Sequence, residues 1–241
     1  MTDLEQLKRD LVTCTRLLVL AGILDYSGHL SARVPGTDRV LIQPRDASRA
    51  ALTADDLLVV DLDGALVEGD VPPPAETAIH TGVYRNRPDA ALVCHGHPTL
   101  STTFSMTDRP FLPMRHFAYR DPDGLPVHPD ATHITTREQG DAVAATLGDR
   151  HACLLRAHGT VLVAPTVQEL LMDCLDLEEN ARTLLAATQL TSGADGGELR
   201  PLSPEECAEI GRSYSRSRHR PHKLWEHYVH RGTTAGILGL P

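Results

Sequence analysis

The spacing of short apolar segments between amphipathic ones limits most strongly which folds are open to this chain. Segments 40–43, 57–62, 65–68, 90–95, 152–156 and 161–163 read as β-strands, and another short strand is expected within the loop at 26–36. The Asp63-Gly64 pair predicts a tight turn that joins two of these strands into a β-hairpin. There is no regular βαβ alternation and no G-x-G-x-x-G motif, so a dinucleotide-binding fold is disfavoured. The sequence predicts an α/β or α+β sandwich in which helices pack around one sheet.

Helix starts are marked by capping boxes, in which Ser or Thr is followed by Glu three residues later. Such pairs begin at Thr2, Thr135, Thr166 and Ser203. They predict helices that end near residues 22, 147 and 190, and a further helix after residue 203. The prolines at 72–74 predict one more helix over 75–86. We expect a single domain over 1–241, with 200–241 as a helical C-terminal extension.

Charge and cysteine content exclude several classes of protein. The chain has 23 Lys and Arg against 32 Asp and Glu, which gives a net charge of −9. Nucleic-acid binding is therefore not expected, and the basic stretch 212–220 is read as a solvated helix face. No apolar run reaches the roughly 18 to 20 residues that span a bilayer, so no membrane partner is expected. Five cysteines without a C-x-x-C motif, and a start that lacks the pattern of a signal peptide, predict a cytoplasmic protein.

Histidine is the overrepresented residue type, with 13 copies against 3 Phe, 5 Tyr and 1 Trp. On a helix, Glu76 and His80 are four residues apart and share a face. In an extended chain, His95 and His97 point the same way, and His158 follows another predicted strand. Three imidazoles with one carboxylate match a catalytic site for a divalent metal, in which three protein ligands leave a position for water or substrate.

Simpler explanations stay open for each of these residues. Glu76 could favour the helix dipole, His80 could be an ordinary helix-face residue or support a ligand, and His158 could be a surface imidazole. The other histidines are expected to be solvent-exposed or to form a basic helix face: His116, His128, His133 and His151 in loops, and His219, His222, His227 and His230 near the C-terminus. Cys94 and Cys153 lie in apolar strands and are expected to be core residues. No G-x-S-x-G motif anchors a serine hydrolase.

Several motifs resemble those of the class II aldolase/adducin family in order and spacing. They are GHLSAR at 28–33, LLVVDLDG at 57–64, PAETAIH at 74–80, YRNRPD at 84–89, VCHGHP at 93–98 and LLRAHG at 154–159, and LEENA at 177–181 also fits. The resemblance covers roughly residues 5–190. It implies a single α/β/α domain around a mostly antiparallel sheet, and a homo-oligomer with four-fold symmetry. It also implies one divalent metal ion per subunit, for which we expect Zn²⁺ first and Mn²⁺, Co²⁺ or Fe²⁺ as alternatives.

The same resemblance implies roles for individual residues. By the matching motifs, His95, His97 and His158 would bind the metal, and Glu76 would be the acid/base residue. The adducin branch of the family is cytoskeletal and lacks this site. Because all four positions are filled here, the resemblance implies an enzyme with a small-molecule substrate.

The motifs depart from the family's sugar-phosphate aldolases where those enzymes cradle phosphate. His29 replaces the Asn of a Gly-Asn-x-Ser loop, Arg45-Asp46 replaces a hydroxyl-Gly turn, and Pro74-Ala75 replaces a Ser pair. Proline has no N–H, and alanine has no side-chain donor, so a phosphate would lose several hydrogen bonds. Arg45 and Arg49 could instead bind a planar carboxylate, or they could be ordinary surface arginines.

The Gly-His-x-Ser form resembles the family's decarboxylases of hydroxylated aromatic or pyridine dicarboxylates. We therefore expect decarboxylation of a hydroxylated aromatic acid, such as a dihydroxyphthalate. The alternatives are aldol cleavage of a hydroxy-oxo acid or sugar derivative, a non-catalytic adducin-like interaction protein, and a metal-dependent oxygenase. The remaining expected site residues are Gly28 and Ser31 at the substrate, His29 or Tyr119 assisting the proton transfer, and Tyr228, which could cross to a neighbouring subunit.

Overall fold

A single twisted sheet forms the centre of the computed structural model, which describes residues 3–192, 196–216 and 219–239. Its eight strands follow the order β4-β3-β2-β1-β5-β8-β7-β6. They are β1 (His29–Arg33), β2 (Arg39–Ile42), β3 (Leu58–Asp61), β4 (Leu66–Glu68), β5 (Leu92–Gly96), β6 (Val127–His128), β7 (Ala152–Leu155) and β8 (Gly159–Ala164). Only the β6–β7 pair among them is parallel, so the predicted mostly antiparallel sheet is confirmed.

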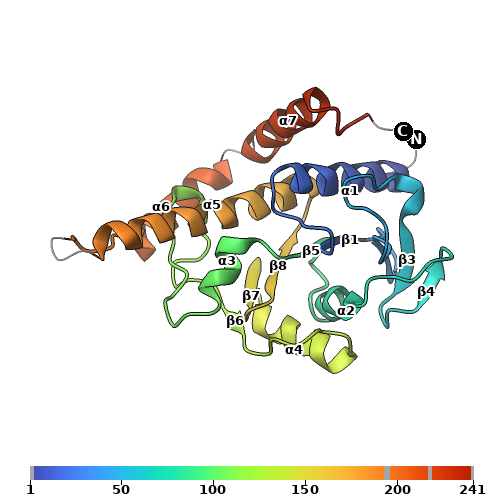
Figure 1. The fold of residues 1–241 in the computed structure, drawn as a ribbon, viewed down its shortest axis with the longest axis horizontal. Coiled ribbons are helices and arrows are strands. Elements are labelled where there is room, and N and C mark those ends of the chain that lie inside the picture. The colour runs from blue at the N-terminus through green and yellow to red at the C-terminus, as the bar shows by residue number, and fades with distance from the viewer. Residues whose placement is uncertain (1–2, 193–195, 217–218, 240–241) are drawn as a thin grey trace.

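Helices cover both faces of this sheet (Figure 1). They are α1 (Asp3–Leu20), α2 (Thr77–Asn86), α3 (Thr99–Phe104), α4 (Arg137–Leu147), α5 (Val167–Thr191), α6 (Pro204–Arg216) and α7 (His219–Thr234), with short 3₁₀ turns at Ala54–Asp56 and His116–Ala118. One apolar core lies between the sheet and α1 and α5, and a second lies between the sheet and α2 and α4. Helix α7 packs on α1 and α5 from outside. Among the described helices, none is long and apolar enough to cross a membrane.

Side chains of the inner strands β2, β3, β5, β7 and β8 alternate between the two cores, as the pleat requires. In β5, Leu92 and Cys94 enter the first core, whereas Val93 enters the second. In β7, Cys153 is fully buried in the second core. Both cysteines are therefore core residues, as predicted.

Most predicted element boundaries agree with the structure within a few residues. The β3–β4 hairpin is confirmed, and so are the helix starts at Thr166 and Ser203, whose hydroxyls accept backbone N–H groups three residues later. The predicted start at Thr2 lies outside the described residues. Helix α2 begins at Thr77 rather than at residue 75, because Glu76 is its N-cap residue.

The capping box predicted at Thr135 is wrong by one residue. Thr136 is the N-cap of α4, where its hydroxyl accepts the Gln139 N–H at 3.3 Å. The Gln139 side-chain oxygen in turn accepts the N–H groups of Thr135 and Thr136. Overlapping Thr135-x-x-Glu138 and Thr136-x-x-Gln139 pairs satisfy the same rule, and the structure uses the second one.

Two histidines that we expected in solvent are not there. His128 lies in β6, is buried, and its Nδ1 is 3.0 Å from the hydroxyl of Thr146. His151 is half-buried, with its Nδ1 3.5 Å from a carboxylate oxygen of Asp121. His116 and His133 are exposed, as predicted.

Helices α2 and α4 cross at a pair of glycines. A Cβ atom on Gly140 would lie 2.1 Å from the carbonyl oxygen of Ala78, and one on Gly82 would lie 2.4 Å from the backbone of Gly140. Because backbone faces backbone there, no side chain can move aside to make room. This close crossing holds α2, and with it Glu76, against α4.

The crossing gives a stability prediction. We expect Gly140→Ala to lower the free energy of unfolding by about 1–3 kcal/mol, the usual cost of overpacking. Gly197→Ala is the matched control, because a Cβ atom there would meet nothing within 4 Å. Urea unfolding of both variants measures the difference, and equal stability of Gly140→Ala and the unmodified chain would contradict the close crossing.

Candidate metal centre

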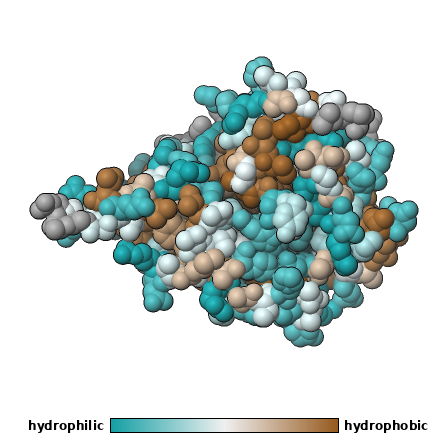
Figure 2. All heavy atoms as spheres, viewed as in Figure 1, coloured by the Kyte–Doolittle hydropathy of each residue, from teal (hydrophilic) through white to brown (hydrophobic). Residues whose placement is uncertain are grey.

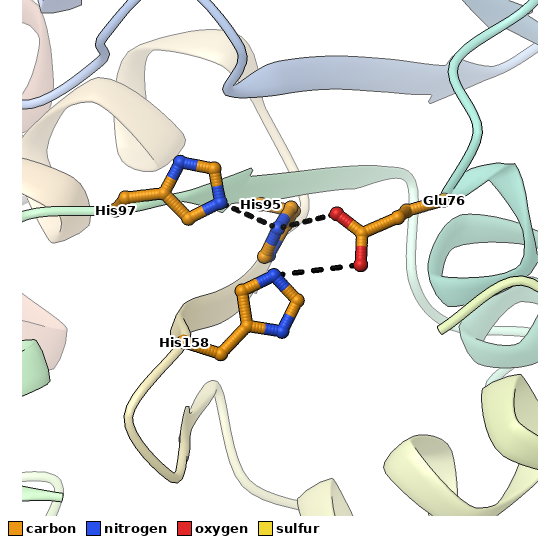
Figure 3. A group of neighbouring side chains, drawn as sticks. All are labelled: Glu76, His95, His97 and His158. Atoms are coloured by element: carbon orange, nitrogen blue, oxygen red, sulfur yellow. Dashed lines mark hydrogen bonds and ion pairs between the residues drawn. The ribbon is translucent and has the colours of Figure 1, made fainter. Parts of the chain in front are cut away.

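Four side chains from separate parts of the sequence converge at one end of the sheet (Figure 3). His95 lies near the end of β5, His97 follows that strand, and His158 directly precedes the neighbouring strand β8. Glu76 reaches the same place from the N-cap of α2. One ligand atom from each of the four residues lies within 4.8 Å of the others. The structure thus brings together the four residues that the sequence singled out.

The ring nitrogens of this cluster are set up to bind a cation. Nδ1 of His95 lies 3.0 Å from the carbonyl oxygen of Thr160, and Nδ1 of His97 lies 3.1 Å from Oδ2 of Asp25. Carbonyl and carboxylate oxygens only accept, so both Nδ1 atoms donate, and each Nε2 keeps a lone pair. These two Nε2 atoms face each other at 3.2 Å, where two lone pairs repel unless a cation lies beside them. The donor set therefore fits a divalent metal ion.

Glu76 completes the cluster as a carboxylate. Its two oxygens lie 3.5 Å from Nε2 of His95 and 3.4 Å from Nε2 of His158. The oxygen beside His158 also accepts the backbone N–H of Ile134 at 3.0 Å. Burial raises the pKa of Glu76, but the hydrogen bonds that its carboxylate accepts, among them that from the Ile134 N–H, outweigh burial and hold the pKa below its ordinary value. The group is fixed from two sides and remains ionised.

A strained turn places His158. Ala157 has φ of 55°, and among the described residues it is the one non-glycine residue with positive φ. The N–H of Ala157 donates to the hydroxyl of Ser105 at 3.0 Å, which holds this turn in place. The next residue after His158 must be glycine, because a Cβ atom on Gly159 would lie 2.3 Å from the carbonyl oxygen of Gly96. Strain of this kind is found where a functional residue is held in place.

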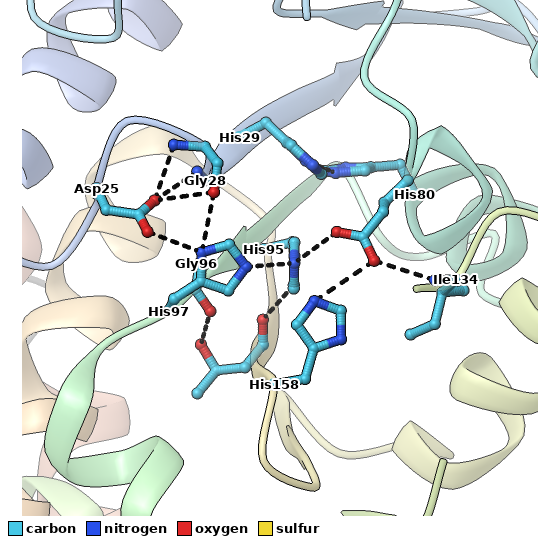
Figure 4. Close-up of polar contacts among 12 residues, drawn as sticks. Asp25, Gly28, His29, His80, His95, Gly96, His97, Ile134 and His158 are labelled. Atoms are coloured by element: carbon cyan, nitrogen blue, oxygen red, sulfur yellow. Dashed lines mark hydrogen bonds and ion pairs between the residues drawn. The ribbon is translucent and has the colours of Figure 1, made fainter. Parts of the chain in front are cut away.

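Asp25 supports His97, and we did not identify it from the sequence. Its Oδ1 accepts the N–H groups of Ser27 and Gly28 at 2.9 and 2.8 Å, and its Oδ2 faces His97 (Figure 4). An Asp that bonds the backbone two and three residues later is a recognisable turn pattern. The sequence D-x-S-G at 25–28 therefore indicates the turn. It does not indicate the contact of Asp25 with His97, which is 72 residues away.

This contact gives a testable prediction about metal affinity. We expect Asp25→Asn to weaken metal binding by about 10- to 100-fold, as is usual when a residue behind a metal ligand is lost. Asn keeps an oxygen for the Ser27 and Gly28 N–H groups but cannot accept from His97 through its NH₂ group. Asp61→Asn is the matched control, since Asp61 makes a similar turn in the β3–β4 hairpin. Competition with a chelator measures both affinities, and an unchanged affinity in Asp25→Asn would rule out the supporting role.

The predicted substrate residues on β1 lie next to the cluster. Gly28 is so close to β5 that an added Cβ atom would lie 3.2 Å from the carbonyl oxygen of His95. His29 pairs with His95 across the β1–β5 ladder, and their ring centroids are 5.2 Å apart. Ser31 points the same way but is completely buried, and its hydroxyl bonds to His80 and Tyr84.

The two arginines considered for carboxylate binding are placed differently. Arg45 is exposed and donates to the carbonyl oxygen of Pro73 at 3.3 Å. Arg49 is buried, and its guanidinium donates to the carbonyl oxygens of Gly28, Pro44 and Ala47. Arg49 is thus not a surface arginine, and its guanidinium is not free to bind a substrate carboxylate. It holds the loop that carries Gly28.

The two candidate tyrosines lie elsewhere in the chain. Tyr119 stacks on Tyr214 of α6 with a ring-centroid distance of 5.1 Å. Tyr228 of α7 lines a cavity with Leu20, Ile23 and Leu224, where Figure 2 shows apolar side chains gathered at the surface. Neither phenol contacts the four-residue cluster within the described part of the chain. A role for Tyr228 in the site of a neighbouring subunit stays a prediction.

Comparison with known proteins places the chain in a family. Residues 9–185 match the family described as the class II aldolase and adducin N-terminal domain. The chain is 29% identical over 210 residues to a 3,4-dihydroxyphthalate decarboxylase from Arthrobacter keyseri, covering 81% of this chain and 82% of the relative. It is 28% identical over 187 residues to a 5-methylthioribulose-1-phosphate/5-deoxyribulose-1-phosphate aldolase from Rhodospirillum rubrum, covering 76% and 82%. A crystal structure of an aldolase II superfamily protein from Pseudomonas syringae has the same fold, with a TM-score of 0.84, 23% identity and coverage of 98% and 96%. The chain therefore belongs to the class II aldolase and adducin family.

Proposed function

We propose that this protein is a divalent-metal-dependent carbon–carbon lyase that decarboxylates a hydroxylated aromatic acid of the dihydroxyphthalate type. The observation that carries the proposal is the convergence of Glu76 with three imidazoles, of which two are held by Thr160 and Asp25 with their lone pairs inward. The similarity to a dihydroxyphthalate decarboxylase supports the same reaction.

We assign His95, His97 and His158 to hold the metal ion. Three imidazole ligands suit Zn²⁺ best, with Mn²⁺, Co²⁺ and Fe²⁺ as alternatives. When bound, such an ion supplies a Lewis acid that stabilises negative charge on substrate oxygens.

We assign Glu76 to move the proton. When the bond between the ring carbon and the carboxylate breaks, CO₂ leaves and its bonding electron pair stays with the substrate. The ring carbon must then take up a proton. We assign the Glu76 carboxylate, which lies at the edge of the cluster, to take a proton from a substrate hydroxyl group first and then to deliver it to the ring carbon. The Ile134 N–H fixes one oxygen of Glu76, which keeps the carboxyl group in one orientation.

The residues around the centre favour a substrate without phosphate. Pro74 has no N–H to offer, Ala75 has no side-chain donor, and the Arg45 guanidinium is exposed and turned to Pro73. Aldol cleavage of a non-phosphorylated substrate is the second candidate, because the similarity to an aldolase is about as high. We further propose a cytoplasmic homotetramer in which 1–241 is one domain. The five free, buried cysteines support a reducing compartment.

A thermal-shift comparison tests the substrate class. With the Zn²⁺-loaded protein, we expect a dihydroxyphthalate at a hundredfold excess over its Kd to raise the Tm by about 5–10 °C. A ketose 1-phosphate should stabilise the protein less. A larger shift with the sugar phosphate would contradict the proposed substrate. If no divalent metal shifted the Tm, the adducin-like alternative would be favoured over an enzyme.

A further inference from the structure

A chain of hydrogen bonds runs from His29, beside the candidate metal centre, into the core. Nδ1 of His29 lies 2.7 Å from Nε2 of His80, and Nδ1 of His80 lies 2.6 Å from the hydroxyl of Ser31 (Figure 4 shows the two rings in line). The Ser31 hydroxyl lies 2.9 Å from that of Tyr84. All four side chains are buried, so they are shielded from competing water.

Two regular elements bring these four residues together. His29 and Ser31 are two residues apart on β1 and therefore lie on the same face of the sheet. His80 and Tyr84 are four residues apart on α2 and therefore share one face of that helix. The α2 helix packs its face on that side of the sheet, and the four polar groups interdigitate.

The direction of the hydrogen bonds follows from the innermost group. A buried hydroxyl proton without an acceptor costs about 1–3 kcal/mol, so the Tyr84 proton must be used. Among the described residues, the acceptor that Tyr84 meets is the Ser31 hydroxyl. Tyr84 therefore donates to Ser31.

The remaining protons are then determined step by step. The single proton of Ser31 goes to its other partner, Nδ1 of His80. An imidazole carries at least one N–H, so His80 has its proton on Nε2 and donates it to Nδ1 of His29. With Nδ1 accepting, His29 in turn must carry its proton on Nε2.

The Nε2 atom of His29 is available to a ligand. It has no hydrogen-bond partner among the described residues, and it is not one of their fully buried unpartnered atoms. The ring stands beside that of His95, across the β1–β5 pair.

We propose that Tyr84, Ser31 and His80 lock His29 as the Nε2–H tautomer, so that His29 donates a hydrogen bond to an anionic oxygen of the substrate at the candidate metal centre. The inference rests on the proposed function for the substrate, but the tautomer depends only on the hydrogen-bond chain. His80, Ser31 and Tyr84 are positioning residues, and His29 is the group that touches substrate. The site accordingly selects substrates with a carboxylate, phenolate or enolate oxygen at this position.

Selective ¹⁵N-histidine NMR of the Zn²⁺-loaded full chain tests the tautomer without any turnover. The signal assigned to His29 through a His29→Gln variant is expected to show Nε2–H in the unmodified protein. Tyr84→Phe removes only the innermost donor and should let His29 sample the Nδ1–H form. Tyr26→Phe, at an exposed tyrosine, is the matched control and should leave the signal unchanged. An Nδ1–H tautomer in the unmodified protein would overturn the inference.

Kinetics with the dihydroxyphthalate tests the donor role. We expect Tyr84→Phe and Ser31→Ala to lower kcat by about 10- to 100-fold, the range for a lost charge-assisted hydrogen bond, with zinc content unchanged. Two variants are used so that the folding of one is not decisive, and a Tm near that of the unmodified chain shows that each is folded. If the unmodified protein turned over and both folded variants kept its kcat, the donor role would be wrong. If His29 is Nε2–H while the unmodified protein does not decarboxylate, the tautomer stands and only the proposed function fails.

Discussion

Replacing His95 with alanine is expected to remove the metal from the candidate centre and to lower turnover by about 10³-fold, as a loss of about 4 kcal/mol of charge stabilisation implies. His95 is the middle of the cluster, because its Nε2 lies 3.2 Å from that of His97 and 3.5 Å from a Glu76 oxygen. It is also fully buried, so no other side chain can take its place without the sheet moving.

The measurement is the metal content per chain after gel filtration in a fixed zinc concentration, together with the decarboxylation rate. His222→Ala is the matched control, since this histidine is exposed on α7. His97→Ala is a second variant at a less buried position, in case His95→Ala does not fold. Full metal content and full rate in both ligand variants would show that the cluster is not the metal site.

Glu76→Gln is expected to keep the metal and to lower kcat by about 10²- to 10⁴-fold, the usual contribution of a positioned general acid or base. Glutamine has nearly the same shape, and its side-chain oxygen can still accept the Ile134 N–H. It cannot pick up and release a proton in the reaction. The variant therefore separates proton transfer from metal binding, which the histidine variants cannot do.

Steady-state kinetics and metal analysis of the same protein sample give the result. Glu226→Gln, at an exposed position on α7, controls for the change of charge. A kcat equal to that of the unmodified chain would remove Glu76 from the mechanism. A loss of metal together with activity would instead make Glu76 a ligand.

The candidate centre could be predicted because its residues carry local signals. His95 and His97 are spaced to point the same way at a strand end, and His158 precedes a glycine that admits no side chain. Glu76 lies at a helix start after three prolines. Each signal is contained in a few consecutive residues, and the antiparallel pairing of β5 and β8 then brings the strand ends together.

The hydrogen-bond chain behind His29 could not be predicted in this way. The i, i+2 spacing of His29 and Ser31 and the i, i+4 spacing of His80 and Tyr84 are both visible in the sequence. Which face of α2 meets which face of β1 depends on how the helix packs, and that is decided by contacts such as Gly82 against Gly140. Sequence reasoning therefore left Ser31 as a direct substrate contact and His80 without an assigned partner.

Other errors have the same origin in long-range contacts. Arg49 is buried because the carbonyl oxygens of Gly28, Pro44 and Ala47 converge on its guanidinium. Gly28 is 21 residues away in the sequence. His128 is buried because the two-residue strand Val127–His128 pairs with β7. Prolines flank this strand on both sides, so its own strand propensity is low and the sequence does not indicate it.

Carbon dioxide release from a dihydroxyphthalate by the Zn²⁺-loaded chain tests the proposed function most directly. We predict one CO₂ released for each molecule of acid consumed, loss of the activity on treatment with a chelator, and its return when Zn²⁺ is added back. A chain shown to hold one metal ion that releases no CO₂, while producing an aldehyde from a hydroxy-oxo acid or sugar derivative, would contradict decarboxylation and establish the aldolase instead.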